Sequence, residues 1–123
     1  MDAEELKRRT KEFAHRCIKL ALALPNTTLG NHLQRQLVRC STSVAANYRA
    51  VCLAQSKSHF ASKLSIVTEE ADECAFWVEF CVEEGMLSKQ RVVDLLVEAH
   101  ELTSIFVSAR KTAKDRTSEF NNP

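Results

Sequence analysis

The stretch from Gln36 to Arg49 constrains the fold most, because its apolar positions follow the period of an α-helix. It contains no Gly or Pro. Steps of four and three residues join its apolar side chains, as in a helix that packs one stripe against its neighbours. The apolar stripe consists of Leu33, Leu37, Cys40, Val44 and Val51, and the polar Asn47 lies in register with it. Small side chains lie between these positions, which is typical of a helix at the centre of a bundle.

Three further helices are predicted from the same period and from residues that cap or end helices. Asp2 suits the N-cap of the first helix, which Pro25 ends, and Ser88 suits the N-cap of the last. Gly85 suits the left-handed position after a helix. The predicted helices span residues 3–24, 29–54, 58–84 and 89–116, and the polar tail 117–123 is expected to be frayed.

The connections between these helices contain only a few residues, and the third helix has Ser56 or Ser58 as its cap. Short links between helices of similar length make neighbouring helices antiparallel. A chain of 123 residues is long enough to bury one core without disulfides. We therefore expect an all-α fold in which residues 1–123 form a single antiparallel up-down-up-down four-helix bundle.

The cysteines predict a reducing compartment. They are five in number, no two have C-x-x-C spacing, and four lie on apolar helical stripes. Small core residues explain them better than disulfides or zinc ligands. The amino terminus is acidic, and no apolar run reaches the roughly 18 residues of a membrane span. We expect a soluble cytoplasmic protein with no membrane partner. The cysteines are Cys17, Cys40, Cys52, Cys74 and Cys81.

Charge is unevenly distributed along the chain, although the formal net charge is only +1. Between Phe13 and Thr68 there are seven Lys or Arg and no acid, whereas between Glu69 and Glu101 ten acids accompany two basic residues. The folded protein should therefore have a dipolar surface, or should pair these two regions with each other.

A pattern of residues between about Leu29 and Leu87 resembles a known family. It consists of Gln36-Leu37, Arg39, Thr42-Ser43-Val44, Ala46-Asn47-Tyr48-Arg49, Ser58, Phe60, Lys63-Leu64, Ile66, Glu70-Ala71, Glu73 and Phe76-Trp77. In these positions the chain resembles the four-helix-bundle proteins related to those encoded in 23S ribosomal RNA intervening sequences. More distantly, its Phe-Trp-Val stretch and helix order are similar to the accessory variability protein of diversity-generating retroelements.

The resemblance implies a cyclic homo-oligomer, a pentamer in particular, and it favours a nucleic-acid partner. One position departs from the family pattern. Related proteins usually carry an acid three residues after Asn47, where this chain has Ala50. No role that depends on that acid is expected here.

The basic residues of the helix at 29–54 are the main functional candidates. Arg35, Arg39 and Arg49 share one outward face, which spans roughly 21 Å at about 1.5 Å per residue. This helix has no acid, and the planar fork of Arg suits phosphate. We expect a non-enzymatic scaffold that binds RNA or DNA electrostatically through this face, with Lys57 and Lys63 extending it.

Alternatives to this interpretation stay open. The arginines can form an ordinary solvated face, or can pair across a subunit boundary with acids. A protein-only adaptor would instead present the acidic surface of 58–84 and 89–116 to a basic partner. Tyr48 can stack on a base, although one aromatic is thin support for single-strand recognition. The acids for the pairing alternative are Glu69, Asp72, Glu79 and Glu83.

The helix at 58–84 carries more apolar surface than one bundle core can use. Phe76, Trp77 and Phe80 lie off its inner stripe, and aromatic residues are favoured at interfaces. These three residues are predicted to form a subunit interface. The alternative is that the bundle is wide and buries Trp77 at one edge.

Polar residues at the inner edges of two helices predict a structural hydrogen-bond network between Ser43, Asn47, Glu70 and Glu73. A catalytic pair of Glu70 and Glu73 is the alternative, but no nucleophile or histidine accompanies these acids in the sequence. A di-iron bundle needs two Glu-x-x-His motifs, and only residues 12–15 supply one. We therefore expect no enzymatic activity, no metal and no cofactor.

Overall fold

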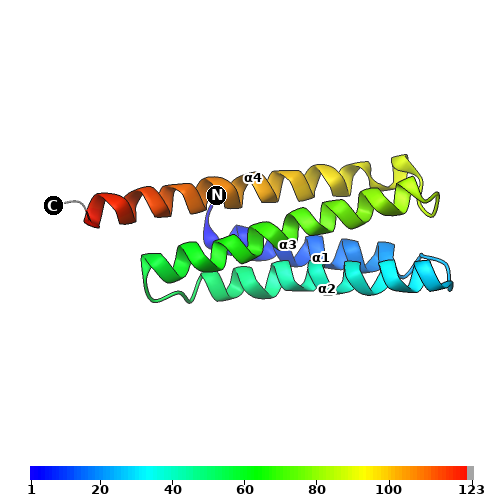
Figure 1. The fold of residues 1–123 in the computed structure, drawn as a ribbon, viewed down its shortest axis with the longest axis horizontal. Coiled ribbons are helices and arrows are strands. Elements are labelled where there is room, and N and C mark those ends of the chain that lie inside the picture. The colour runs from blue at the N-terminus through cyan, green and yellow to red at the C-terminus, as the bar shows by residue number, and fades with distance from the viewer. Residues whose placement is uncertain (122–123) are drawn as a thin grey trace.

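The computed structural model describes residues 1–121, with side chains described for residues 1–114. Within this range the chain forms four α-helices and no strand: α1 (Ala3–Ala21), α2 (Thr28–Val51), α3 (Lys57–Glu83) and α4 (Lys89–Asn121). Successive helices run in opposite directions along one long axis (Figure 1). The predicted all-α fold with four helices is confirmed.

Each helix begins at a polar side chain that accepts a hydrogen bond from a backbone N–H three residues later, at 2.8 to 3.3 Å. Such a bond satisfies one of the N–H groups that the first helical turn leaves unpaired. The predicted caps at the first and last helices are confirmed, and the structure selects Ser56 rather than Ser58. The capping residues are Asp2, Thr27, Ser56 and Ser88.

The helices end at slightly different positions from those predicted. Residues 23–24 and 53–54 form tight turns with backbone hydrogen bonds to the third residue back, so α1 and α2 each end three residues earlier than predicted. Gly85 has φ of 72°, the left-handed conformation expected after α3. Helix α4 continues to Asn121, where a frayed tail was expected, because no Gly or Pro interrupts it before Pro123.

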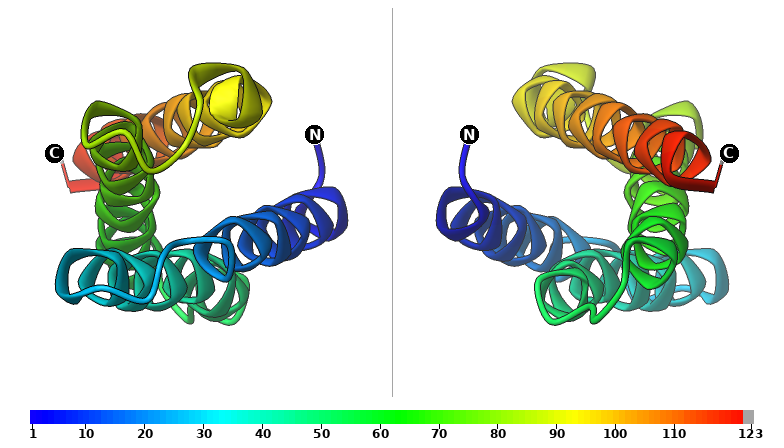
Figure 2. Two further views of the ribbon diagram at one scale, coloured as in Figure 1. Left: turned by 90° about the vertical axis from the view of Figure 1, so that its right-hand side faces the viewer. Right: turned by 90° about the vertical axis from the view of Figure 1, so that its left-hand side faces the viewer.

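The four helices form a C-shaped arrangement when viewed along the bundle (Figure 2). Helix α2 packs between α1 and α3, and α3 packs between α2 and α4, whereas α1 and α4 touch only sparsely. Within residues 1–114, Arg9 joins the two outer helices through ion pairs with two acids of α4. Arg9 Nε donates to Glu98 Oε2 at 3.1 Å, and the Arg9 guanidinium lies 3.6 Å from Glu101.

The predicted core cysteines are buried, with Cys17, Cys40, Cys74 and Cys81 each at 0% exposure. Cys40 Sγ lies 3.0 Å from Cys74 Sγ between α2 and α3. Hydrogen bonding to Cys17 and Cys40, together with burial, raises the pKa of Cys74, and burial raises the pKa of Cys81 to about 11. Protonated thiols are poor nucleophiles and metal ligands, so these residues serve the core.

Candidate nucleic-acid interface

Helix α2 exposes the three arginines that the sequence places on one outward face. Arg35, Arg39 and Arg49 are all exposed, as are Thr42 and Ala46 between them. Their surroundings differ, because the bundle places α3 along one side of α2 and α1 along the other. The face therefore divides into distinct parts.

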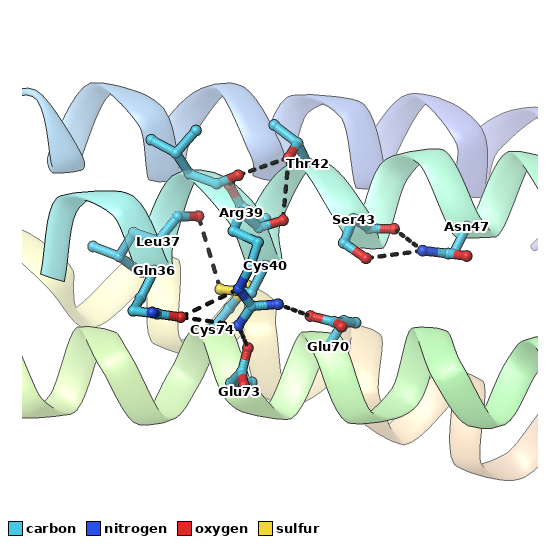
Figure 3. A network of polar contacts seen from close by, with 12 residues as sticks. Gln36, Leu37, Arg39, Cys40, Thr42, Ser43, Asn47, Glu70, Glu73 and Cys74 are labelled. Atoms are coloured by element: carbon cyan, nitrogen blue, oxygen red, sulfur yellow. Dashed lines mark hydrogen bonds and ion pairs between the residues drawn. The ribbon is translucent and has the colours of Figure 1, made fainter. Parts of the chain in front are cut away.

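Arg39 is held by acids of its own chain (Figure 3). Its Nη1 lies 3.3 Å from Glu70 Oε2, its Nη2 donates to Glu73, and its Nε donates to Gln36 Oε1 at 3.2 Å. The hydrogen bond to Glu73 is the main cause of the raised pKa of Arg39. Two carboxylates thus neutralise this guanidinium within the protomer, and its position in the predicted phosphate-binding row is weakened.

The predicted polar network forms as two separate units, seen side by side in Figure 3. Asn47 Nδ2 donates to Ser43 O at 2.9 Å and to Ser43 Oγ at 2.8 Å, both within α2. Glu70 and Glu73 instead bind Arg39, and among the described residues no hydrogen bond joins Asn47 to either acid. Asn47 is satisfied one turn back along its own helix, so the link between α2 and α3 is ionic.

Arg49 lines a groove between α1 and α2, which we call the cationic groove. Its volume is about 380 Å³, and it is lined by Lys7, Lys11, Ala45, Ala46 and Arg49. Lys7 Nζ lies 3.0 Å from Glu4 Oε1. Within residues 1–114, no side-chain hydrogen bond or ion pair holds Lys11 or Arg49. The groove therefore holds two cations that no acid neutralises.

Lys7 and Lys11 were not predicted from the sequence. They lie four residues apart, hence on one face of α1, which was the available signal. That signal alone does not show which helix the face adjoins. The antiparallel packing of α1 against α2 places both lysines beside Arg49.

The other predicted basic residues do not join this groove. Arg35 is exposed near the opposite end of α2, and Lys63 is half-buried on α3. Lys57 is exposed at the start of α3, at the same end of the bundle as the C-terminal end of α2 (Figure 1). The candidate phosphate-binding residues thus occupy separate places along the bundle.

Tyr48 is not available to stack on a base. Its side chain is 6% exposed, and its ring stacks on Phe106 with 5.6 Å between ring centroids. Burial raises the pKa of its hydroxyl. Tyr48 is a core residue of α2, which excludes the stacking role weighed from the sequence.

Comparisons with known proteins agree with this architecture. A sequence profile described as 23S rRNA-intervening sequence protein matches residues 4–108. The chain belongs to this family. A crystal structure of a protein of unknown function from the S23 ribosomal protein family of Bacteroides thetaiotaomicron VPI-5482 superposes with a TM-score of 0.82 at 28% identity, over 90% of this chain and 99% of that chain. No curated protein matches the sequence.

In this 23S rRNA-intervening sequence family member, the predicted interface aromatics form one cluster. Phe76 is 51% exposed, while Trp77 and Phe80 are half-buried. The Trp77 ring lies 4.9 Å from Phe76, 6.1 Å from Phe80 and 5.6 Å from His32, between centroids. Trp77 Nε1 is covered by the chain itself and has no hydrogen-bond partner. Phe76 is therefore the most exposed member of the predicted interface.

Glu70 and Glu73, the acids weighed as a catalytic pair, both bind Arg39. Among the described residues, no group of three His, Cys, Asp or Glu side chains is arranged to hold a metal ion. In the same part of the chain, no helix is both long and apolar enough to cross a membrane.

Proposed function

We propose that this family member is a non-enzymatic helical scaffold that binds RNA or DNA electrostatically through the face shared by α1 and α2. One observation carries the proposal: Lys11 and Arg49 line one groove without an acid to neutralise them. Arg35 belongs to the same proposal because it is exposed and, within residues 1–114, has no ion-pair partner. Arg39 is left out because Glu70 and Glu73 hold it.

The physical reason is counterion release. A cation that neutralises a phosphate frees ions condensed on the nucleic acid, so affinity falls with added salt in proportion to the number of contacts. Arg39 already has carboxylate partners, so binding a phosphate would require breaking its ion pairs. Within residues 1–114, Lys11 and Arg49 have no ion pair that a phosphate would have to break.

The test is fluorescence anisotropy with labelled mixed-sequence RNA and DNA oligonucleotides across a potassium chloride series. Arg35→Gln and Arg49→Gln should each reduce the slope of log affinity against log salt by about 0.7 to 0.9. Affinity that does not depend on salt, or slopes unchanged by both substitutions, would remove the proposal.

We also propose that copies of the chain associate through Phe76, Trp77 and Phe80. A half-exposed Phe beside two further aromatics is typical of an interface rather than of a solvated helix face. A cyclic homo-oligomer, such as a pentamer, would repeat the basic face and bind one strand at several points.

Light scattering on Phe76→Ala tests this association. The variant should have a lower mass than the wild-type chain at equal concentration. Leu53→Ala is the matched control, since Leu53 is 74% exposed on the turn after α2, away from the cluster. An equal mass for all three proteins would show that the aromatic cluster does not join subunits.

A protein-only adaptor is the competing function, and the acidic side of the chain is the observation that favours it. Five exposed acids on α3 and its neighbours make no ion pair within residues 1–114. A basic peptide that binds equally well to the Arg35 and Arg49 variants, with no nucleic-acid binding by any variant, would favour the adaptor. These acids are Glu69, Asp72, Glu83, Glu84 and Asp94.

A further inference from the structure

The cationic groove has the features of a specific site rather than of a diffuse basic surface. We propose that it is a phosphate-binding site, in which Lys7, Lys11 and Arg49 hold one phosphate group of the bound strand. The inference rests on the proposed function for the source of the phosphate. It adds a location, a set of ligating residues and a fixed stoichiometry, which electrostatic binding to a face does not require.

Convergence of charges from two helices is the first argument. Lys7 and Lys11 lie one turn apart on α1, and Arg49 reaches the same hollow from α2. Arg49 can bond two phosphate oxygens with its planar fork, while the two ammonium groups act as point charges around the remaining oxygens. By contrast, the hollow beside Arg16 and Lys19 is lined only by residues of α1 and by Leu22, the C-cap of the same helix.

The small side chains that line the groove on α2 are the second argument. Ala45 and Ala46 line it, and a side chain that ends at Cβ leaves the space between the cations open. The volume of about 380 Å³ lies within the range of small-molecule sites, roughly 300 to 1,000 Å³. A phosphate with its attached sugar fits a hollow of that size, whereas a longer residue at 45 or 46 would fill it.

Glu4 is the internal competitor for the site. Its carboxylate binds Lys7 at 3.0 Å, so a phosphate must share this lysine with Glu4. Glu4→Gln removes the competing charge and should tighten phosphate binding, although it removes an ion pair. Glu12→Gln is the matched control, because Glu12 binds Arg8 at 3.1 Å on the same helix and does not line the groove.

The first experiment uses inorganic phosphate and pyrophosphate, with ionic strength held constant by potassium chloride. Methyl NMR signals of Ala45 and Ala46 should shift on titration. Binding should weaken about tenfold or more in Lys11→Gln, as expected for loss of one charge-assisted hydrogen bond. Arg16→Gln, an equal charge change on α1 outside the groove, should leave the titration unchanged.

A substitution between uncharged residues tests the shape of the groove separately from its charge. Ala46→Leu fills the groove without altering any cation, and it should weaken phosphate binding. Thr42→Leu adds apolar bulk one turn earlier on the same exposed face and should not. Because residues 42 and 46 are both exposed, circular dichroism should show that these variants fold. Equal binding by wild type, Ala46→Leu and Lys11→Gln would overturn the site.

The second experiment repeats the salt series with the oligonucleotides. Lys11→Gln should lower the salt slope by about 0.7 to 0.9, and Arg16→Gln should not. Strand binding that is insensitive to Lys11→Gln overturns the phosphate site and leaves the proposed function standing. Phosphate-induced shifts without strand binding support the site and overturn the proposed function.

Discussion

Each of the two sides of α2 carries an exposed arginine, but among the described side chains only one of these arginines is held by acids. On the side of α3, Arg39 is held by Glu70 and Glu73. On the side of α1, Arg49 lies beside Lys7 and Lys11 and has no acid partner within residues 1–114. Both arginines are exposed and belong to one helix. The charge of the neighbouring helix therefore decides whether an arginine stabilises the fold or stays available to a ligand.

The comparison follows from how charge is distributed along the chain. Ten acids lie between Glu69 and Glu101, on α3, its C-cap and α4, and none lies between Phe13 and Thr68. Helix α2 packs between α1 and α3, so its cations face two different neighbours. Helix α3 carries acids that can bind them, whereas the residues of α1 that line the groove are lysines. The following substitutions test that difference.

The largest effect is expected from Lys11→Glu, which gives the α1 side an acid like those on the α3 side. The new carboxylate lies beside Arg49 and neutralises it, and the charge of Lys11 is lost as well. Loss of two phosphate contacts should lower oligonucleotide affinity about a hundredfold at about 0.1 M salt, measured by anisotropy. Arg16→Glu makes the same charge change outside the groove. Equal losses in both variants would mean that only net charge matters.

The buried thiols of α3 should also affect the stability of the fold at alkaline pH. Because the pKa of Cys81 is raised to about 11 and that of Cys74 is raised as well, these thiols ionise in the unfolded chain first. Their contribution is complete below about pH 8.5 and is lost as pH rises toward the folded pKa, by about 1.4 kcal/mol per pH unit for each thiol.

Urea unfolding between pH 7 and pH 10, a range set by the ordinary thiol pKa of about 8.5, measures this loss. Cys81→Ala removes one titrating group and should flatten the decline in the free energy of unfolding. A decline of the same steepness in the variant would show that Cys81 does not contribute to it.

A smaller effect is expected when Arg39 is released. Replacing Glu70 and Glu73 together by Gln makes the α3 side of α2 resemble the α1 side, and oligonucleotide affinity should rise about fivefold to tenfold through one new phosphate contact. Glu69→Gln with Asp72→Asn removes the same charge from exposed neighbours on α3. A gain of the same size in that control would reflect net charge and not the release of Arg39.

The smallest effect is expected from Arg39→Gln. The substitution should lower the free energy of unfolding by about 0.5 to 1 kcal/mol, as for a partly exposed ion pair, with oligonucleotide affinity nearly unchanged. Arg35→Gln should instead lower oligonucleotide affinity and leave the free energy of unfolding nearly unchanged, since Arg35 has no ion-pair partner within residues 1–114. Chemical denaturation and anisotropy on the same two variants provide both measurements.

Much of the fold was predictable from local sequence. Capping side chains such as Asp2 and Ser88, the left-handed Gly85 and the four-three apolar period act within a few residues, so the sequence determines helices whatever they pack against. The helix ends at residues 22–24 and 52–54 were missed because tight turns and continued helix differ by a single backbone hydrogen bond per residue.

The candidate site was predictable only in part. Exposure of Arg35, Arg39 and Arg49 follows from their register against the core stripe of α2. The ion pairs of Arg39 were not predicted, because they join residues 31 and 34 positions apart across two helices. Spacing along one helix does not determine the rotation of the next.

The sequence by itself determined four amphipathic helices with buried apolar stripes that include cysteines, and a chain divided into a basic and an acidic region. Only the tertiary structure decided which cations remain available. Helix periodicity is a local property of the backbone, whereas the neutralisation of a charge depends on which side chain lies within about 4 Å of it across a helix interface. For this family member, that difference separates Arg39 from Arg49.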